Sequence, residues 1–417
     1  MNESMHIRPT AGGFPAGLQT RNQFLRTLGA AAVSGVAMAV LPGRAAPATP
    51  AAEMPAAPPA ATDAPPTPLP SYLQGYETLY RKDPHAAAIE WHRQAKWGLF
   101  VHYALASLRG LTAQQSLQAK AGSAAAWKKL KQGTPGEYAK LKGRFTAAKF
   151  DADFITDLAL AAEMRYINFT TRHLGELFMF RTTVSEFTSL NSPAKRDLVA
   201  ELATQCQKKA LGLFLYCPPD VARSEPQATF DRNRTMLREL LTQYGPVAGI
   251  WLDGIGSYYE DPKAYGRINE QYAFIRSLQP QCLISFKQGT GSEDFVAPEG
   301  LMHVKAGPIA EQAWALNAGK RGDICTNMQT APPSWMYLDG CEHLDANQLL
   351  AVLADAFAQK ANLTINTGPL PDGSIHPADV VALRDAGARI RKDGFPAATA
   401  ADRAGRKNDK KKSITPP

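Results

Sequence analysis

Gly245-Pro-Val-Ala-Gly-Ile-Trp-Leu-Asp-Gly254 is the stretch of sequence that decides the fold. Its centre, Val247 to Leu252, is almost wholly apolar, with a glycine and a proline in front. An apolar run of this length without polar alternation is typical of a strand buried on both faces. The run ends at Asp253, and a charge at the end of a buried strand is costly unless it is paired or used. Because Asp-Gly is also a common turn dipeptide, this stretch alone leaves a structural and a catalytic interpretation of Asp253 open.

Similar apolar runs predict further buried strands along the chain, at 96–103, 166–171, 211–217, 282–287 and 363–366. Helical patterns separate them, at 86–96, from Asp151, from Ser192-Pro193, and at 231–244, 265–278, 344–359 and 378–390. This alternation implies a parallel sheet covered by helices. The number of units favours a (β/α)8 barrel over a doubly wound sheet. Residues 104–148 read as a long connection with some helix near Trp127, and the pattern is unclear between 289 and 333.

The two ends of the chain differ in composition from its middle. We expect residues 1–46 to be an export signal peptide, because Arg21 and Arg26 precede an apolar, alanine-rich run. The stretch around Arg21 resembles a twin-arginine signal with Asn22 in place of the second arginine. Residues 47–71 are an Ala/Pro-rich linker, 72–395 the barrel, and 396–417 a Lys-rich disordered tail. This organisation predicts an exported protein, periplasmic or secreted, without a stable membrane anchor once the signal is removed.

Charge and cysteine content exclude some classes of function. The net charge is +8, but residues 1–45 carry +3 of it and 402–417 carry +4, so the middle is nearly neutral. No basic stripe interleaved with aromatic residues is present, and nucleic acid is not an expected partner. The five cysteines are widely spaced, and no pair has the spacing of a metal site. The sequence does not give the oligomeric state.

Polar side chains stand at the ends of five successive predicted strands: His102, His173, Tyr216, Asp253 and Lys287. The carboxyl ends of barrel strands converge on one mouth, so we expect these side chains to lie together. One histidine at a strand end is more often structural, but five such residues are hard to explain by packing. The sequence has no nucleophile elbow, phosphate loop or His pair at metal-ligand spacing. A carboxylate, hydrogen-bonding rings and a cation suit a polyhydroxylated ligand.

Cleavage of a glycosidic bond uses two carboxyl groups, one ionised and one protonated. Glu299 follows the predicted strand at 282–287 on the loop side and is the first candidate for the second group. From spacing alone, Glu260, Glu293 and Asp323 remain alternatives.

Taken together, the residues resemble glycoside hydrolase family 29, the α-L-fucosidase family, from about Trp91 to Phe395. The resemblance rests on segments that follow in the family's order: Ala95 to Tyr103, Phe150 to Ala152, Thr170 to His173, Val184 to Phe187, Ser192 to Val199, Gly249 to Gly254, Asp294 to Glu299 and Asn362 to Pro369. The chain departs from the family at Leu174, where a second histidine is usual, at Tyr103, where a tryptophan is usual, and at Lys287, where well-studied members have an arginine. We expect a single catalytic domain without the family's C-terminal β-sandwich.

The resemblance implies a retaining exo-glycosidase that removes terminal α-L-fucosyl residues from glycoconjugates or oligosaccharides and needs no cofactor. It implies Asp253 as the nucleophile and Glu299 as the acid/base. The residues expected to contact the sugar are His102, His173, Tyr216 and Lys287, with Trp251 and Trp127 as apolar walls. Two alternatives stay open: a barrel glycosidase for a different sugar, since Leu174 removes a polar contact, and a carbohydrate-binding homologue that has lost activity.

Overall fold

The structure is a computed structural model that describes residues 68–397 except for 124, 126–129, 131–133, 174–176, 221–224, 261–266 and 301–307. The expected signal peptide, most of the expected linker, and the expected tail from residue 398 onward lie outside the described residues. Within the described part, no helix is long and apolar enough to cross a bilayer.

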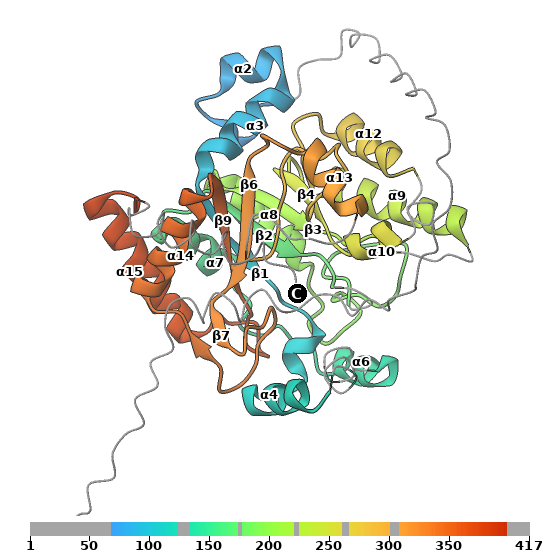
Figure 1. Cartoon of the computed structure of the whole chain (residues 1–417). Helices are drawn as coiled ribbons and strands as arrows, with labels where there is room; N and C mark the ends of the chain where they lie inside the picture. The colour runs from blue at the N-terminus through green and yellow to red at the C-terminus, as the bar shows by residue number, and fades with distance from the viewer. Residues whose placement is uncertain are drawn as a thin grey trace, which may run out of the picture. The chain divides into compact units, whose positions relative to one another are not determined.

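Seven parallel strands form one curled sheet at the centre of the described part (Figure 1). Its order is β5-β4-β3-β2-β1-β9-β6, and each strand is buried at every position. The strands are β1 (Trp97–Val101), β2 (Tyr166–Thr170), β3 (Gly212–Tyr216), β4 (Gly249–Leu252), β5 (Leu283–Phe286), β6 (Gly322–Asn327) and β9 (Ala361–Thr367). The prediction of a parallel sheet buried on both faces is confirmed. β6 falls in the region where the sequence pattern was unclear.

The segment 294–300 lies between the two edge strands of this sheet. On one side, Asp294 N donates to Ile284 O at 2.9 Å and Ala297 N donates to Lys287 O at 2.8 Å. On the other side, Asp323 N donates to Val296 O at 2.8 Å and Cys325 N donates to Pro298 O at 3.0 Å. This irregular segment therefore links β5 to β6 through main-chain bonds.

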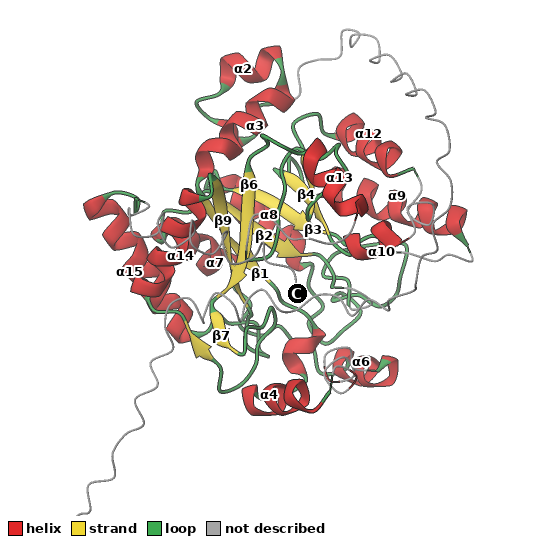
Figure 2. Cartoon of the chain, in the orientation of Figure 1, coloured by secondary structure: helices red, strands yellow, loops and turns green. Residues whose placement is uncertain are grey.

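Helices lie around the sheet and beyond both of its ends, as Figure 2 shows. They are α2 (Glu77–Lys82), α3 (Pro84–Ala95), α4 (Ala113–Gly122), α6 (Pro135–Lys142), α7 (Ala152–Ala161), α8 (Leu198–Lys208), α9 (Pro226–Gln243), α10 (Ile255–Glu260), α12 (Ile268–Leu278), α13 (Pro308–Leu316), α14 (Ala346–Ala358) and α15 (Pro377–Asp393). The described residues also form two short 3-10 turns, η1 (Ser71–Leu73) and η2 (Leu105–Leu108), and a hairpin of β7 (Gln329–Ala331) and β8 (Glu342–His343).

Side-chain caps set where several helices begin. Asp151 accepts from Phe154 N at 3.0 Å, as expected for the residue before α7. The prediction of a helix from Ser192-Pro193 is wrong by about one and a half turns, because α8 begins at Leu198 and is capped by Asp197. Ser192 instead donates its hydroxyl to Ser189 O at 2.7 Å and to Phe145 O at 3.1 Å, which holds a turn.

The interior of the curled sheet is closed by α3 at the amino ends of the strands. Trp91 of α3 stacks on Phe214 with ring centroids 6.2 Å apart. A Cβ at Gly212 would lie 2.3 Å from the Trp91 ring, so the first residue of β3 must be glycine for the indole to enter. With α3 filling this end, the carboxyl ends of the strands are left to form a site.

Candidate active site

The side chains expected at the strand ends do gather on one side of the sheet. Tyr216, the last residue of β3, donates its hydroxyl to Asp253 Oδ2 at 2.7 Å. The His102 ring lies 5.4 Å from the Tyr216 ring, and the His173 ring stacks on Tyr216 at 6.0 Å with nearly parallel planes. Lys287 Nζ lies 3.3 Å from Asp253 Oδ1. The structure therefore brings the five strand-end residues together, with Tyr216 and Lys287 in direct contact with Asp253.

Asp253 is surrounded by donors. Its side chain is 20% exposed, and burial by itself raises the pKa of the carboxyl group. The Lys287 ammonium, the Tyr216 hydroxyl and the Gly254 amide, which donates at 2.7 Å, outweigh burial and hold the pKa of Asp253 below its ordinary value. Asp253 is thus an ionised carboxylate at neutral pH, as a nucleophile requires.

Lys287 joins the two proposed catalytic carboxylates. Its ammonium contacts Asp253 and donates to Glu299 Oε1. Burial lowers the pKa of Lys287, but Asp253 and Glu299 more than reverse this and raise it, so the ammonium keeps its charge. The Glu299 side chain is 48% exposed against 11% for Lys287, so Glu299 lies on the open side of the pair.

Aromatic side chains form the walls of the site. Lys287 Nζ lies 4.7 Å from the centre of the Trp251 ring, and Trp251 stacks on Tyr216 at 5.6 Å. Trp335, which the sequence analysis did not single out, lies 4.9 Å from the His102 ring. Trp335 stands on the loop between β7 and β8, where no periodic pattern could identify it. Trp127, the other expected wall, lies outside the described residues.

Asn366 is a second residue that the sequence analysis did not assign to the site. Its Oδ1 lies 2.6 Å from His102 Nδ1. The side chain is 1% exposed and belongs to β9, which pairs with β1, the strand that His102 directly follows. The signal in the sequence that could have identified Asn366 was its position, as a polar residue at the end of a predicted buried strand.

Two of the alternative carboxylates are buried in structural contacts. Glu293, 1% exposed, accepts from the Tyr272 hydroxyl at 2.6 Å and from Thr290 N at 2.8 Å, which holds the turn after β5. Asp323, 2% exposed, lies inside the curled sheet and accepts from Tyr166 at 2.9 Å and Thr364 at 2.7 Å. Glu260 is the exposed last residue of α10. Glu299 is the candidate whose side chain shares a partner with Asp253.

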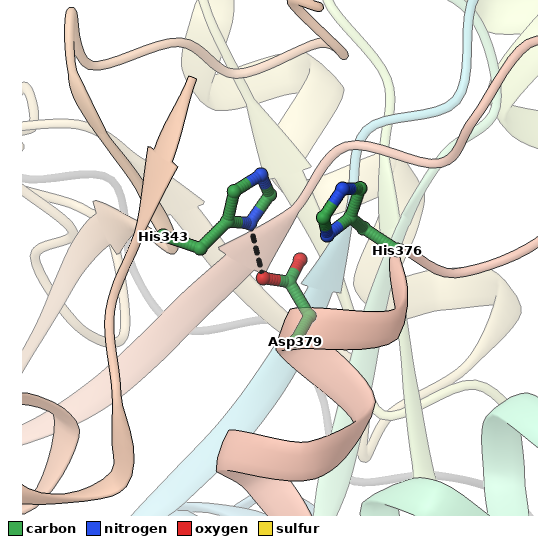
Figure 3. A group of neighbouring side chains, drawn as sticks. All are labelled: His343, His376 and Asp379. Atoms are coloured by element: carbon green, nitrogen blue, oxygen red, sulfur yellow. Dashed lines mark hydrogen bonds and ion pairs between the residues drawn. The ribbon is translucent and has the colours of Figure 1, made fainter. Parts of the chain in front are cut away.

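A group of His343, His376 and Asp379 brings three possible metal ligands within 4.8 Å of one another in the described part (Figure 3). The two imidazole rings stack at 4.0 Å with an interplanar angle of 11°. Imidazole lone pairs lie in the ring plane, so the lone pairs of parallel stacked rings do not converge on one ion. Asp379 accepts from His343 Nδ1 at 2.6 Å and from the Thr367 hydroxyl at 2.7 Å. The arrangement is better suited to holding β8 against α15 than to binding a metal ion.

The model of the α-L-fucosidase family matches residues 73–394. The chain belongs to the α-L-fucosidase family. Rat tissue α-L-fucosidase is 26% identical over 320 residues, which cover 69% of this chain and 64% of the relative. A putative α-L-fucosidase of Caenorhabditis elegans is 24% identical over 313 residues, which cover 68% and 61%. The chain thus spans less than two thirds of the length of these curated relatives.

Solved structures of α-L-fucosidases share the fold. Isoenzyme 1 from Paenibacillus thiaminolyticus superposes with a TM-score of 0.60 at 21% identity, covering 76% of this chain and 79% of that one. The Lactobacillus casei enzyme in complex with its α-L-fucose product gives 0.56 at 23% identity, covering 73% and 98%. At such low sequence identity, the structural similarity is evidence for the fold alone.

Proposed function

We propose that this family member hydrolyses terminal α-L-fucosyl residues with retention of configuration. The observation that carries the proposal is the contact of one ammonium, Lys287 Nζ, with both Asp253 and Glu299 at the carboxyl ends of the strands. A retaining glycosidase needs two carboxyl groups that face one anomeric centre.

The spacing of the two carboxyl groups supports retention. Because both bind one ammonium, their nearest oxygens lie within two contact lengths of each other, or about 6 Å. Retaining enzymes hold these groups about 5–5.5 Å apart, whereas inverting enzymes leave about 6.5–9.5 Å for a water molecule. While both groups contact Lys287, their spacing is closer to the retaining range than to the inverting one, which supports retention.

In this mechanism Asp253 attacks the anomeric carbon, and the bond to the leaving oxygen breaks as Glu299 protonates that oxygen. Water deprotonated by Glu299 then releases the sugar from Asp253. Glu299 must carry a proton when the substrate is bound, so the contact between Lys287 and Glu299 opens at that stage. Its exposed position allows this exchange. Lys287 then stays in contact with Asp253, and its remaining N–H groups donate to sugar hydroxyls.

His102, His173 and Tyr216 supply hydrogen-bonding groups around the sugar, and Trp251 supplies an apolar wall. Sites built of such groups reject analogues that lack the partner hydroxyl, because a buried polar group is then left unpaired. Trp335 adds a second wall beside His102, at a place that the sequence did not indicate.

We also propose that the fold is a closed barrel in which 294–300 is the eighth, irregular strand. Its main-chain bonds to β5 and β6 support this, since they join the sheet edges. Export through residues 1–46 remains a proposal as well. Sequencing the amino terminus of the mature protein isolated from its source would test it, and an uncleaved Met1 would contradict it.

Turnover of 4-nitrophenyl α-L-fucoside, compared with nitrophenyl glycosides of other sugars, tests the proposed function. Asp253→Asn should lower kcat by about three orders of magnitude or more while the fold is kept. Asp231→Asn, an exposed carboxylate on α9, is the matched control and should leave kcat unchanged. Near-normal turnover in a folded Asp253→Asn protein would refute the assignment.

Glu299→Ala tests the acid/base, with Glu260→Ala as its control. The Glu299 variant should keep more activity on activated aryl fucosides than on oligosaccharides, because a good leaving group departs without a proton. Added azide should restore part of the activity and give α-fucosyl azide, the product of two inversions. Equal loss on all substrates with no effect of azide would exclude Glu299.

A further inference from the structure

His102 is a buried imidazole whose two nitrogens have different surroundings. The residue is 4% exposed, and its ring lies among Phe100 at 3.9 Å, Trp335 at 4.9 Å and Tyr216 at 5.4 Å. Nδ1 faces Asn366 Oδ1 at 2.6 Å. Nε2 has no hydrogen-bond partner among the described residues. Which nitrogen carries the proton therefore decides what His102 can offer to a ligand.

The orientation of the Asn366 amide is fixed by its other contacts. Asn366 Nδ2 donates to Trp335 O at 2.8 Å and to Asn327 Oδ1 at 2.8 Å. A main-chain carbonyl can only accept, so the group that faces Trp335 O is the NH2. The atom that faces His102 is therefore the amide oxygen, which also only accepts. A bond of 2.6 Å between them requires that His102 Nδ1 carry a hydrogen.

The charged and titratable groups around His102 favour the neutral ring. Burial, then His173, then Lys287 lower the pKa of His102 well below its ordinary value, and they outweigh Asn366 and Asp253, which act in the opposite direction. A neutral imidazole with its hydrogen on Nδ1 has a bare lone pair on Nε2.

We propose that Asn366 is a positioning residue that fixes His102 as the Nδ1–H tautomer, so that Nε2 accepts a hydrogen bond from a sugar hydroxyl. The specificity that follows is for a ligand group that donates. At the position that His102 contacts, a hydroxyl binds, whereas a fluorine of similar size cannot donate and does not. Were His102 a donor through Nε2, fluorine would be tolerated there.

The tautomer can be measured without any substrate. In the 15N-labelled protein at pH 7, long-range 1H–15N correlation spectra distinguish a protonated ring nitrogen from one with a free lone pair. The His102 signals are assigned as those lost in His102→Gln. We expect a protonated Nδ1 and an unprotonated Nε2. A protonated Nε2, or protons on both nitrogens, would overturn the proposal.

Two substitutions at Asn366 test the positioning role. In Asn366→Leu the acceptor is gone, and we expect the proton to distribute between Nδ1 and Nε2. In Asn366→Asp the carboxylate should favour a second proton on His102. Asn362→Leu is the matched control, since Asn362 is a buried asparagine of the same strand that donates to His92 O, at the opposite end of the sheet. Unchanged His102 signals in both Asn366 variants, provided each keeps the native far-UV spectrum, would refute the role.

The ligand-binding test rests on the proposed function. Titration calorimetry of the Asp253→Asn protein with L-fucose and its monodeoxy and monodeoxyfluoro analogues should show one ring position at which both changes weaken binding about 10- to 100-fold. Full retention of affinity by every fluoro analogue would overturn the acceptor role. If L-fucose does not bind at all while the nitrogen signals are as expected, the proposed function fails and the tautomer assignment stands.

Discussion

Replacing Lys287 by methionine is the most informative test of the electrostatics of the site. Methionine keeps much of the length and apolar volume of the stem but removes the charge that faces both carboxylates. Lys287 Nζ lies 3.3 Å from Asp253 Oδ1, and at an effective dielectric constant of about 20 the attraction is about 5 kcal/mol. Lys287 is the strongest of the groups that lower the pKa of Asp253. Removing it should therefore raise that pKa.

The net effect is smaller than the Coulomb energy, because desolvation of both charges opposes it and the Tyr216 and Gly254 donors remain. A hydrogen bond between charged groups is worth about 1.5–3 kcal/mol net. At 1.36 kcal/mol per factor of ten, this free energy corresponds to a factor of about 10 to 150. At a given pH on the acidic limb, the ratio of kcat/KM to its plateau value should therefore be lower by this factor in Lys287→Met than in the unmodified protein.

The assay is the pH profile of kcat/KM for 4-nitrophenyl α-L-fucoside, whose acidic limb reports ionisation of the nucleophile in the free enzyme. The limb should move to higher pH in Lys287→Met and return in Lys287→Arg, which restores the cation. Lys320→Met is the matched control, because Lys320 is a partly buried lysine that bonds Gly291 O and Glu293 O. An acidic limb that stays in place in Lys287→Met would refute the assignment of Lys287 as the group that keeps Asp253 ionised.

Three further outcomes follow from other contacts. Tyr216→Phe removes a 2.7 Å bond to Asp253 and should lower kcat/KM about 10- to 100-fold, with the acidic limb again at higher pH. Gly249→Ala would put a Cβ 2.5 Å from Leu283 O, so urea titration should show a loss of about 3 kcal/mol or more, whereas Gly256→Ala, with open space around it, should be nearly neutral. Burial and His343 lower the pKa of His376, so below about pH 6.5 the unfolded chain binds more protons than the folded one, and stability decreases as the pH is lowered. His376→Gln should therefore make the decrease in Tm between pH 7 and pH 5 smaller. An equal decrease in Tm in the variant would contradict this.

Most strands could be predicted because burial on both faces leaves a simple pattern of apolar residues. β1 to β5 and β9 all fall within their predicted runs or within two residues of them. β6, Gly322–Asn327, was missed although it is equally buried. It contains Asp323, Thr326 and Asn327, and such polar side chains are compatible with a buried strand only when partners exist. The partners of Asp323, Tyr166 and Thr364, are distant in sequence, so only the fold shows that they are there.

The same distinction explains which site residues were found. His102, Tyr216, Asp253 and Lys287 stand at the ends of predicted strands, and convergence of parallel strands at their carboxyl ends is enough to bring them together. Trp335 and the amide orientation of Asn366 depend on a loop whose path is set by contacts far along the chain, such as the bond from Asn366 to Trp335 O. No local pattern encodes such contacts.

Glu299 shows how a catalytic candidate can be placed accurately outside regular structure. Its segment is no regular strand, yet Gly300 N donates to Cys325 O at 2.9 Å and Cys325 N donates to Pro298 O at 3.0 Å, on either side of Glu299. These bonds fix the main chain against β6 while the side chain stays half exposed. An acid/base must contact first a leaving group and then water, so it needs a fixed main chain and an accessible side chain. The nucleophile needs the opposite, and Asp253 is correspondingly enclosed by Tyr216, Lys287 and the Gly254 amide. The different exposure of the two carboxylates is therefore an argument for their roles that is independent of sequence resemblance.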